Sequence, residues 1–336
     1  MSNNCGCHQN PPSSGPAPVK HDYSKAQALT AILNPGNQKK VLLYQTLTVN
    51  GTLGYEYATF SPDQSVKSQG YNQGVVGNYD EQPSPLSPVT KWGSNIVSMV
   101  MDGVVNVYGV SAHTNSMCLL SPVYQPLKLA EVDKNLNSKI AGCTNGQGQA
   151  WLYFQKSDGG KTGYIYEKSL TKLNEKPTKL VITKDAKLDT DIVAFYDGRR
   201  RWIAYQTWMD GDDDDESYSQ IQIVCLDDES AKDHYMQGSK TVLDKELIEL
   251  AATSAVKNGK ELIYIYFRGQ ASNLYWSAAE LTKNGAKFST PENLKQIKMD
   301  RRSSLAVLPH DEGIVVYGIK KSGDGIEAFL DPFVFK

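Results

Sequence analysis

The sequence predicts an all-β protein, a six-bladed β-propeller made of four-stranded antiparallel blades. Three observations support this fold. A short apolar stretch recurs six times, a polar and usually glycine-bearing gap follows each copy, and a strand dense in β-branched and aromatic residues follows each gap. The chain has 336 residues, of which 40% are hydrophobic and 21% are charged. A repeat of this kind along a chain of this length is typical of a propeller, in which each copy forms one blade.

The apolar stretch is the first strand of each predicted blade. The six copies occupy residues 29–33, 96–100, 140–144, 192–196, 250–254 and 305–309. Asn, Asp and Gly recur in the gaps that follow, and these residues favour tight turns. A short strand, such a turn and a second strand together are the sequence pattern of a β-hairpin.

Second and third strands complete the repeat. The second strands occupy residues 41–45, 105–109, 151–155, 202–206, 264–268 and 314–318, and the third strands occupy 53–59, 117–120, 164–167, 221–226, 274–278 and 326–330. The ends of the second strands lie 46 to 64 residues apart, which leaves room for a fourth, more polar strand. One such sheet cannot bury both faces, whereas six around an axis cover one another. A β-sandwich with coincidental strand spacing is the alternative fold.

The N-terminal segment differs in composition from the repeats. Residues 1–24 are rich in Asn, Ser, Pro and Gly, so we expect a disordered tail followed by a propeller over residues 25–336. The segment has no basic stretch followed by an apolar one, as a secretory signal would. Five cysteines are an odd and sparse set that fits a reduced compartment. We therefore expect a cytoplasmic protein, or one exported without a classical signal peptide.

Charge and hydropathy restrict the expected partners. The formal net charge is −2, which gives no bulk positive field for nucleic acid or an anionic membrane. No apolar stretch approaches the roughly 18 residues that a membrane-spanning helix needs. We expect a glycan or small-molecule ligand, no nucleic acid, no membrane and no cofactor, and we allow for a homodimer.

The blade pattern resembles that of the fungal fucose-specific lectins. Blades of those six-bladed propellers read roughly Ile-Ala-Ala, a glycine-bearing turn, Arg-Val-Tyr-Tyr-Gln and then an Ile-x-Glu strand. The best copies in this chain are residues 29–60, 140–167 and 250–280. The resemblance implies sugar sites between neighbouring blades, each with an Arg at the start of the second strand, a Glu on the third, and stacking aromatic rings. Arg and Glu form charge-assisted hydrogen bonds with hydroxyls, while a ring covers the C–H face of the sugar.

The polar residues of that family are absent from the matching positions. The Arg position holds Val41, Val105, Trp151, Trp202, Tyr264 and Ile314, and the Glu position holds Tyr55, Leu119, Tyr166, Ile223, Trp276 and Ala328. Charges such as Glu167 and Arg201 stand one residue away, where their side chains point to the opposite face of the sheet. The resemblance therefore supports the fold, but fucose binding with the usual geometry is not expected.

Aromatic residues replace those charges on blades three to five. They are Trp151, Tyr166, Trp202, Tyr264 and Trp276. We predict that they form the ligand-binding site, where rings stack on a sugar, an aryl group or a terpenoid. The alternative interpretation is that they belong to the core between blades, because aromatic residues on strands pack well there.

Three further motifs have both a functional and a structural interpretation. The acidic run over residues 210–216 either binds Ca²⁺ or forms a solvated hairpin tip, and we expect the tip. Cys5, Cys7 and His8 are three candidate ligands for a soft metal without a fourth, so we predict no metal site. The run Arg199–Arg201 either grips a phosphate or carboxylate or is a plain surface turn.

The function expected from these patterns is a non-catalytic, lectin-like propeller that binds a carbohydrate or another small ligand between blades by aromatic stacking. No catalytic motif is present, so catalytic residues are unassigned. An enzyme, either a glycosidase or a cyclase of small-molecule biosynthesis, is the first alternative. Its carboxylates would be sought first at Asp191, Asp197 and Glu261. A protein-interaction scaffold is the second alternative.

Overall fold

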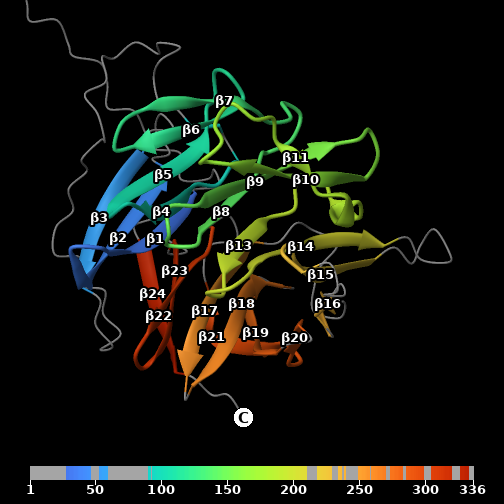
Figure 1. Cartoon of the computed structure of the whole chain (residues 1–336). Coiled ribbons are helices and arrows are strands. Elements are labelled where there is room, and N and C mark those ends of the chain that lie inside the picture. Colours follow the sequence, from blue (N-terminus) through green and yellow to red (C-terminus); the bar gives the residue numbers. More distant parts are fainter. Residues whose placement is uncertain are drawn as a thin grey trace, which may run out of the picture.

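The structure is a computed structural model, and it shows a ring of antiparallel β-sheets (Figure 1). It describes residues 28–46, 53–59, 90–91, 93–209, 218–228, 234–236, 238–239, 249–257, 259–269, 273–282, 285–298, 304–319 and 326–332. The predicted tail, the acidic run and the Cys5, Cys7 and His8 cluster lie outside these residues. No helix within them is long and apolar enough to cross a membrane.

Blades 1 and 2 are separate antiparallel sheets. Blade 1 has the order β1 (Leu29–Asn34), β2 (Asn37–Thr46) and β3 (Leu53–Thr59). Blade 2 has the order β4 (Val97–Met101), β5 (Val104–Val110), β6 (Ser116–Ser121) and β7 (Gln125–Glu131). Each innermost pair is a hairpin whose turn contains glycine, such as Gly103 with a φ of 77° between β4 and β5. Only glycine adopts that conformation without strain.

Blades 3 and 4 form one continuous nine-stranded sheet. Blade 3 contains β8 (Ile140–Thr144), β9 (Ala150–Ser157), β10 (Thr162–Ser169) and β11 (Thr178–Lys179). Blade 4 contains β13 (Ile192–Tyr196), β14 (Arg201–Met209), β15 (Tyr218–Cys225) and β16 (His234–Tyr235). The connection between them includes a 3₁₀ turn, η1 (Val181–Thr183), and the bridging strand β12 (Ala186–Lys187). Strand β12 pairs with β10 on one side and with β14 on the other, so it joins the two blades.

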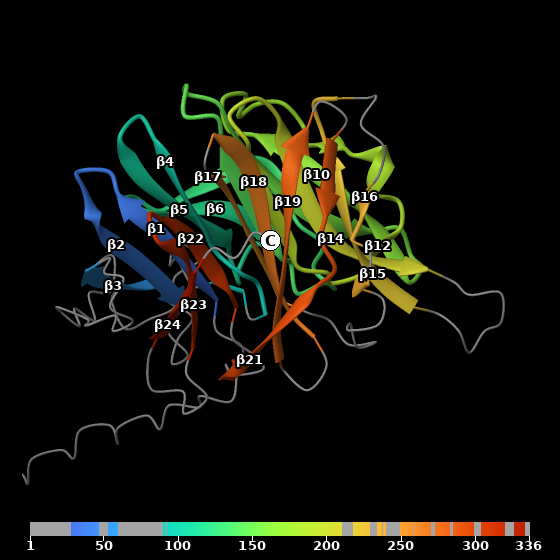
Figure 2. The same ribbon diagram turned by 90° about the horizontal axis from the view of Figure 1, so that it is seen from below.

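Blades 5 and 6 complete the ring. Blade 5 contains β17 (Leu250–Lys257), β18 (Lys260–Arg268), β19 (Asn273–Thr282), β20 (Gly285–Phe288) and β21 (Glu292–Lys298). Blade 6 contains β22 (Ala306–His310), β23 (Gly313–Ile319) and β24 (Ile326–Pro332). Figure 2 shows the blade 5 strands β17, β18 and β19 side by side. In the described parts of the chain, blades 1 and 6 contribute three strands each and the other blades at least four.

The innermost strands β1, β4, β8, β13, β17 and β22 each contact the next, and β22 contacts β1, so six blades close a ring. This confirms the six-bladed propeller that the repeat predicts. These strands line a central cavity of about 170 Å³. Along each strand, alternate side chains face the two neighbouring blades. On β14, Trp202 and Ala204 pack toward blade 5, while Ile203 and Tyr205 pack toward blade 3.

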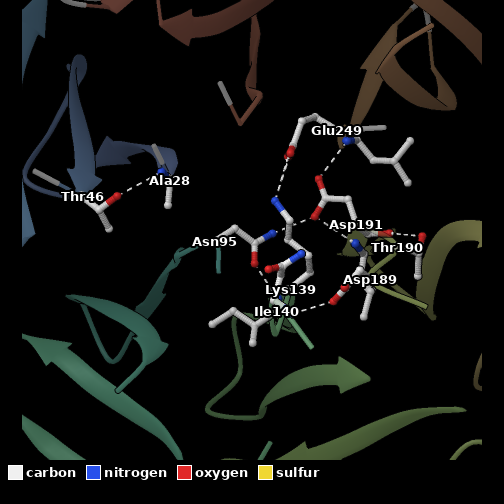
Figure 3. Close-up of polar contacts among 12 residues, drawn as sticks. Ala28, Thr46, Asn95, Lys139, Ile140, Asp189, Thr190, Asp191 and Glu249 are labelled. Carbon is white, nitrogen blue, oxygen red and sulfur yellow. Dashed lines mark hydrogen bonds and ion pairs between the residues drawn. The ribbon is translucent and has the colours of Figure 1, made fainter. Parts of the chain in front are cut away.

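A buried polar network crosses the ring at the ends where the innermost strands begin (Figure 3). Asn95 of blade 2 donates to Asp191 of blade 4 over 2.7 Å and accepts a hydrogen bond from the main chain of Ile140. Asp191 also accepts from the main-chain N–H of Leu250 at 2.8 Å. The ammonium of Lys139 pairs with Glu249 at 3.0 Å. These contacts join blades 2, 3, 4 and 5 through the buried side chains of Asn95 and Asp191 and the half-buried ion pair of Lys139 and Glu249.

Candidate ligand-binding cleft

A cleft of about 480 Å³ opens between blades 3 and 4. Its walls come from the ends of β9 and β10, the loop that follows β10, and the turn between β13 and β14. Most of the side chains that line it are polar or charged. Trp151 is the one tryptophan among them, and Glu167, Arg201 and Asp227 lie around it.

The strand register of blade 3 places the side chains of Trp151 and Glu167 on the face toward blade 4. Glu167 lies opposite Tyr153 in the β9–β10 ladder, and Trp151 lies opposite Ser169. Tyr153 is buried in the cluster shared with blade 4. Because side chains two residues apart share a face of a sheet, Trp151 and Glu167 point into the same inter-blade space.

Arg201 reaches that space from the other side. It is the first residue of β14 and shares a face with Ile203 and Tyr205, which pack toward blade 3. Its Nη1 donates to Oε2 of Glu167 over 2.6 Å, which is an ion pair between blades. Its Nε donates to Asp227 at 2.9 Å, and Asp227 also accepts from the main-chain N–H of Arg201 at 2.7 Å.

The guanidinium of Arg201 also lies over an aromatic face. Its central carbon is 4.5 Å from the ring centroid of Trp151, within the range of a cation–π contact. Burial alone lowers the pKa of Arg201, but the hydrogen bonds with Asp227 and the charge of Glu167 outweigh it, so the pKa is raised. The side chain therefore stays charged at every physiological pH.

Around Trp151, the cleft thus presents an indole, the guanidinium of Arg201 and the carboxylates of Glu167 and Asp227 to a ligand. Among the described residues, the hydrogen bonds of these side chains use three guanidinium hydrogens, those on Nε, Nη1 and Nη2, and one oxygen of Glu167. A guanidinium has five N–H donors and a carboxylate has two acceptor oxygens. Two donors of Arg201 and Oε1 of Glu167 remain outside these bonds. Such donors and acceptors suit a ligand rich in hydroxyl groups.

Two buried charged side chains fix the loops on either side of the cleft. On blade 3, Lys168 is 1% exposed and donates to the carbonyls of Leu173 and Glu175, at 2.8 and 2.5 Å. On blade 4, Asp197 is buried and accepts from the main-chain N–H of Arg199 at 2.8 Å and from the indole of Trp202 at 2.8 Å. Each loop is therefore tied to its own blade.

Of the five predicted aromatic residues, only Trp151 lines this cleft. Trp202 is fully buried between blades 4 and 5, where it stacks on Phe195 at a centroid distance of 6.4 Å. Tyr264 and Trp276 stack on each other at 6.2 Å in the core between blades 5 and 6. This is the core packing that the alternative interpretation describes.

Tyr166 faces away from the cleft as well. Its ring stacks on Phe154 at 5.9 Å and packs against the core between blades 2 and 3. The structure thus does not bring the five aromatic residues together. Ligand binding at Tyr166, Trp202, Tyr264 and Trp276 stays a prediction.

A weak sequence pattern marks two of the charged residues that line the cleft. Glu167 and Arg201 each stand one residue beside a family sugar-binding position, and their side chains do point to the opposite face from that position. A blade has a neighbour on each face, so both displaced side chains enter one cleft from facing blades. Asp227 follows β15 without any pattern that marks it, and sequence reasoning missed it.

The carboxylates considered for catalysis have different surroundings. Asp191 lies in the axial network, where main-chain and amide donors occupy both of its oxygens. Asp197 caps the turn before β14. Glu261 belongs to β18, and its side chain lies outside the described part of the structure. Within the described ranges, no three His, Cys, Asp or Glu side chains form a group that could hold a metal ion.

Comparisons with known proteins identify the fold. No protein-family model and no curated protein matches the sequence. Among solved structures, the fucose-specific lectin from Aleuria aurantia aligns with a TM-score of 0.60 at 17% identity, over 93% of this chain and 97% of that one. AofleA from Arthrobotrys oligospora aligns at 0.57 and 13%, over 92% and 88%. SapL1 lectin in complex with alpha methyl fucoside aligns at 0.54 and 13%, over 94% and 100%.

These similarities cover almost the whole of this chain and of the lectins. The Aleuria aurantia lectin is described as a six-bladed β-propeller with its own mode of fucose recognition. At 13 to 17% identity the likeness concerns the backbone rather than particular side chains. The chain therefore has the six-bladed propeller fold of the fungal lectins, as the blade pattern predicts.

Proposed function

We propose that the protein is a non-catalytic, lectin-like propeller that binds a carbohydrate in the cleft between blades 3 and 4. The observation that supports this most is the meeting of Trp151, Glu167, Arg201 and Asp227 in one cavity. Lectin propellers of the same fold recognise fucose, which makes an inter-blade sugar site a reasonable use of this scaffold.

The chemistry of the cleft suits a sugar. The apolar C–H face of a pyranose packs on the indole of Trp151, a contact of the kind that orients sugars in their sites. Hydroxyl groups donate to Glu167 and Asp227 and accept from Arg201, in charge-assisted hydrogen bonds. The ion pairs already present hold these groups in place, so little side-chain freedom is lost when a ligand binds.

The arrangement predicts a specificity that differs from that of the fucose-binding propellers. Here the guanidinium and Glu167 come from facing blades rather than from successive strands of one blade. Hydroxyl groups must therefore match donors and acceptors spread across the cleft. We expect the preferred glycan to be larger than a single fucose, since the cleft of about 480 Å³ exceeds the volume of one sugar ring.

A glycan array followed by calorimetry tests the proposal. The intact chain should bind at least one family of glycans, and Trp151→Ala should weaken that binding about tenfold, because an aromatic contact contributes roughly 1.5 kcal/mol. Trp208→Ala is the matched control, since Trp208 is partly exposed on β14 but outside the cleft lining. No binding across the array, or equal losses in the two variants, would count against the proposal.

A further inference from the structure

The charges that line the cleft are unevenly paired. All three carboxylates are engaged: Glu167 and Asp227 with Arg201, and Glu175 with Lys172 at 3.4 Å. Four cations line the same space, namely Lys172, Lys176, Arg199 and Arg201. Among the described residues, the side chains of Lys176 and Arg199 contact no carboxylate. The free charge of the cleft is therefore positive.

The two free cations stand on opposite walls. Lys176 belongs to the loop that follows β10 of blade 3, and Arg199 belongs to the turn between β13 and β14 of blade 4. Both side chains are exposed to solvent. A ligand in the cleft lies between them, so an anionic group on it meets a cation on either side.

A buried charged side chain forms a hydrogen bond with the main chain at or next to each cation. Lys168 bonds the carbonyl of Glu175, the residue before Lys176. Asp197 accepts the main-chain N–H of Arg199 itself. Burying a charged side chain is costly unless it is paired or hydrogen-bonded, so these two anchors indicate loops with a defined conformation. Cations on fixed loops lose less freedom when they bind an anion than cations on mobile ones.

From these observations we propose that the cleft selects an acidic saccharide, one that carries a carboxylate or a sulfate group. Lys176 and Arg199 bind the anionic group, while Trp151, Glu167 and Arg201 contact the sugar ring. This inference rests on the proposed function and specifies its ligand class. Arg199 supplies a planar fork that matches a carboxylate or sulfate, and Lys176 adds a point charge.

Pairs of saccharides that share a skeleton and differ in charge show whether the cleft recognises the charge or the shape of its ligand. Trigalacturonic acid and its trimethyl ester share one skeleton, but only the acid is charged. A sulfated galacto-oligosaccharide and its desulfated form make the second pair. In calorimetry the charged member of at least one pair should bind about tenfold more tightly than the neutral one, and the difference should shrink when salt is raised, because salt screens exposed charges.

Charge-removing variants locate the effect. Arg199→Gln with Lys176→Gln should lower the affinity for the charged probe to that for its neutral partner, and should leave the neutral probe unaffected. Lys184→Gln is the control, since Lys184 is exposed but does not line the cleft. Two results would overturn the inference and leave the proposed function standing. One is equal affinity for charged and neutral probes. The other is binding of neutral glycans alone, if Trp151→Ala abolishes that binding. Absence of any Trp151-dependent binding overturns both.

Discussion

At the scale of single residues, the carboxylate of Asp191 has the most unusual surroundings of the axial network. Burial raises its pKa to about 8, and the negative charge of Glu249 acts in the same direction, while Lys139 opposes them. Arg268 and Asp189 place further charges near Lys139. Burial and the neighbouring charge of Glu249 therefore favour the protonated form of Asp191.

This proton makes stability depend on pH. In the unfolded chain an Asp ionises near pH 4, whereas folded Asp191 holds its proton up to about pH 8. Unfolding between these values releases a proton, so the free energy of unfolding falls as pH rises, by at most about 1.4 kcal/mol per pH unit from this group. Above about pH 8 both states are ionised and the contribution levels off.

Asp191→Asn removes the titrating group and should flatten this dependence. The amide loses the bond from the main chain of Leu250 and costs about 1 kcal/mol at low pH. Urea unfolding followed by tryptophan fluorescence at pH 5, 6, 7 and 8 measures the slope. Asp158→Asn, at an exposed turn, should follow the intact protein. Parallel curves for Asp191→Asn and the intact protein would refute the assignment.

Residue-level roles were only partly accessible from the sequence. Trp151 was predicted as a ligand contact and does line the cleft. Arg201 and Glu167 were visible as charges beside the expected positions, but their partnership depends on how two blades face each other, which the order of residues within one blade does not specify. The contact of Asp227 with Arg201 joins residues 26 positions apart, and no local pattern marks it.

At the scale of elements, the loop over residues 170–177 depends on one buried lysine. Lys168→Met keeps the aliphatic volume but removes both hydrogen bonds to the loop carbonyls. Bonds to charged groups contribute roughly 1.5 to 3 kcal/mol, so local opening should become about tenfold more frequent or more. Hydrogen exchange at the amide of Glu175, which bonds the carbonyl of Lys172, reports that opening.

The control for this prediction is Lys184→Met, at an exposed position. It should leave exchange at Glu175 unchanged, and amides within β9 and β10 should stay protected in both variants because the ladder between these strands is intact. Unchanged exchange at Glu175 in Lys168→Met would show that the loop holds its conformation without the lysine.

Most of the long strands could be predicted from the sequence, and the short ones could not. The predicted second strand 202–206 lies within β14, and 151–155 lies within β9, because both combine aromatic and β-branched residues between turn residues. Strand β12 has only two residues, and its pairing with both β10 and β14 is a tertiary contact. No local preference indicates such a bridge.

At the scale of the whole molecule, the six blades share a backbone but differ in chemistry. Arg201 stands in β14, four residues before Tyr205. The equivalent position is occupied by buried Ala150 in β9 and by buried Ile263 in β18. The corresponding positions of those blades therefore lack this guanidinium. The repeat alone suggests equivalent sites, whereas the structure brings an indole, a guanidinium and carboxylates together between blades 3 and 4.

A crystal structure of the protein soaked with its best-binding glycan from the array tests this account most directly. We expect one sugar ring packed against Trp151, with hydroxyl groups within hydrogen-bond distance of Glu167 or Arg201, and the central cavity free of glycan. Glycan bound in another inter-blade cleft or along the axis, with the cleft between blades 3 and 4 vacant, would contradict it.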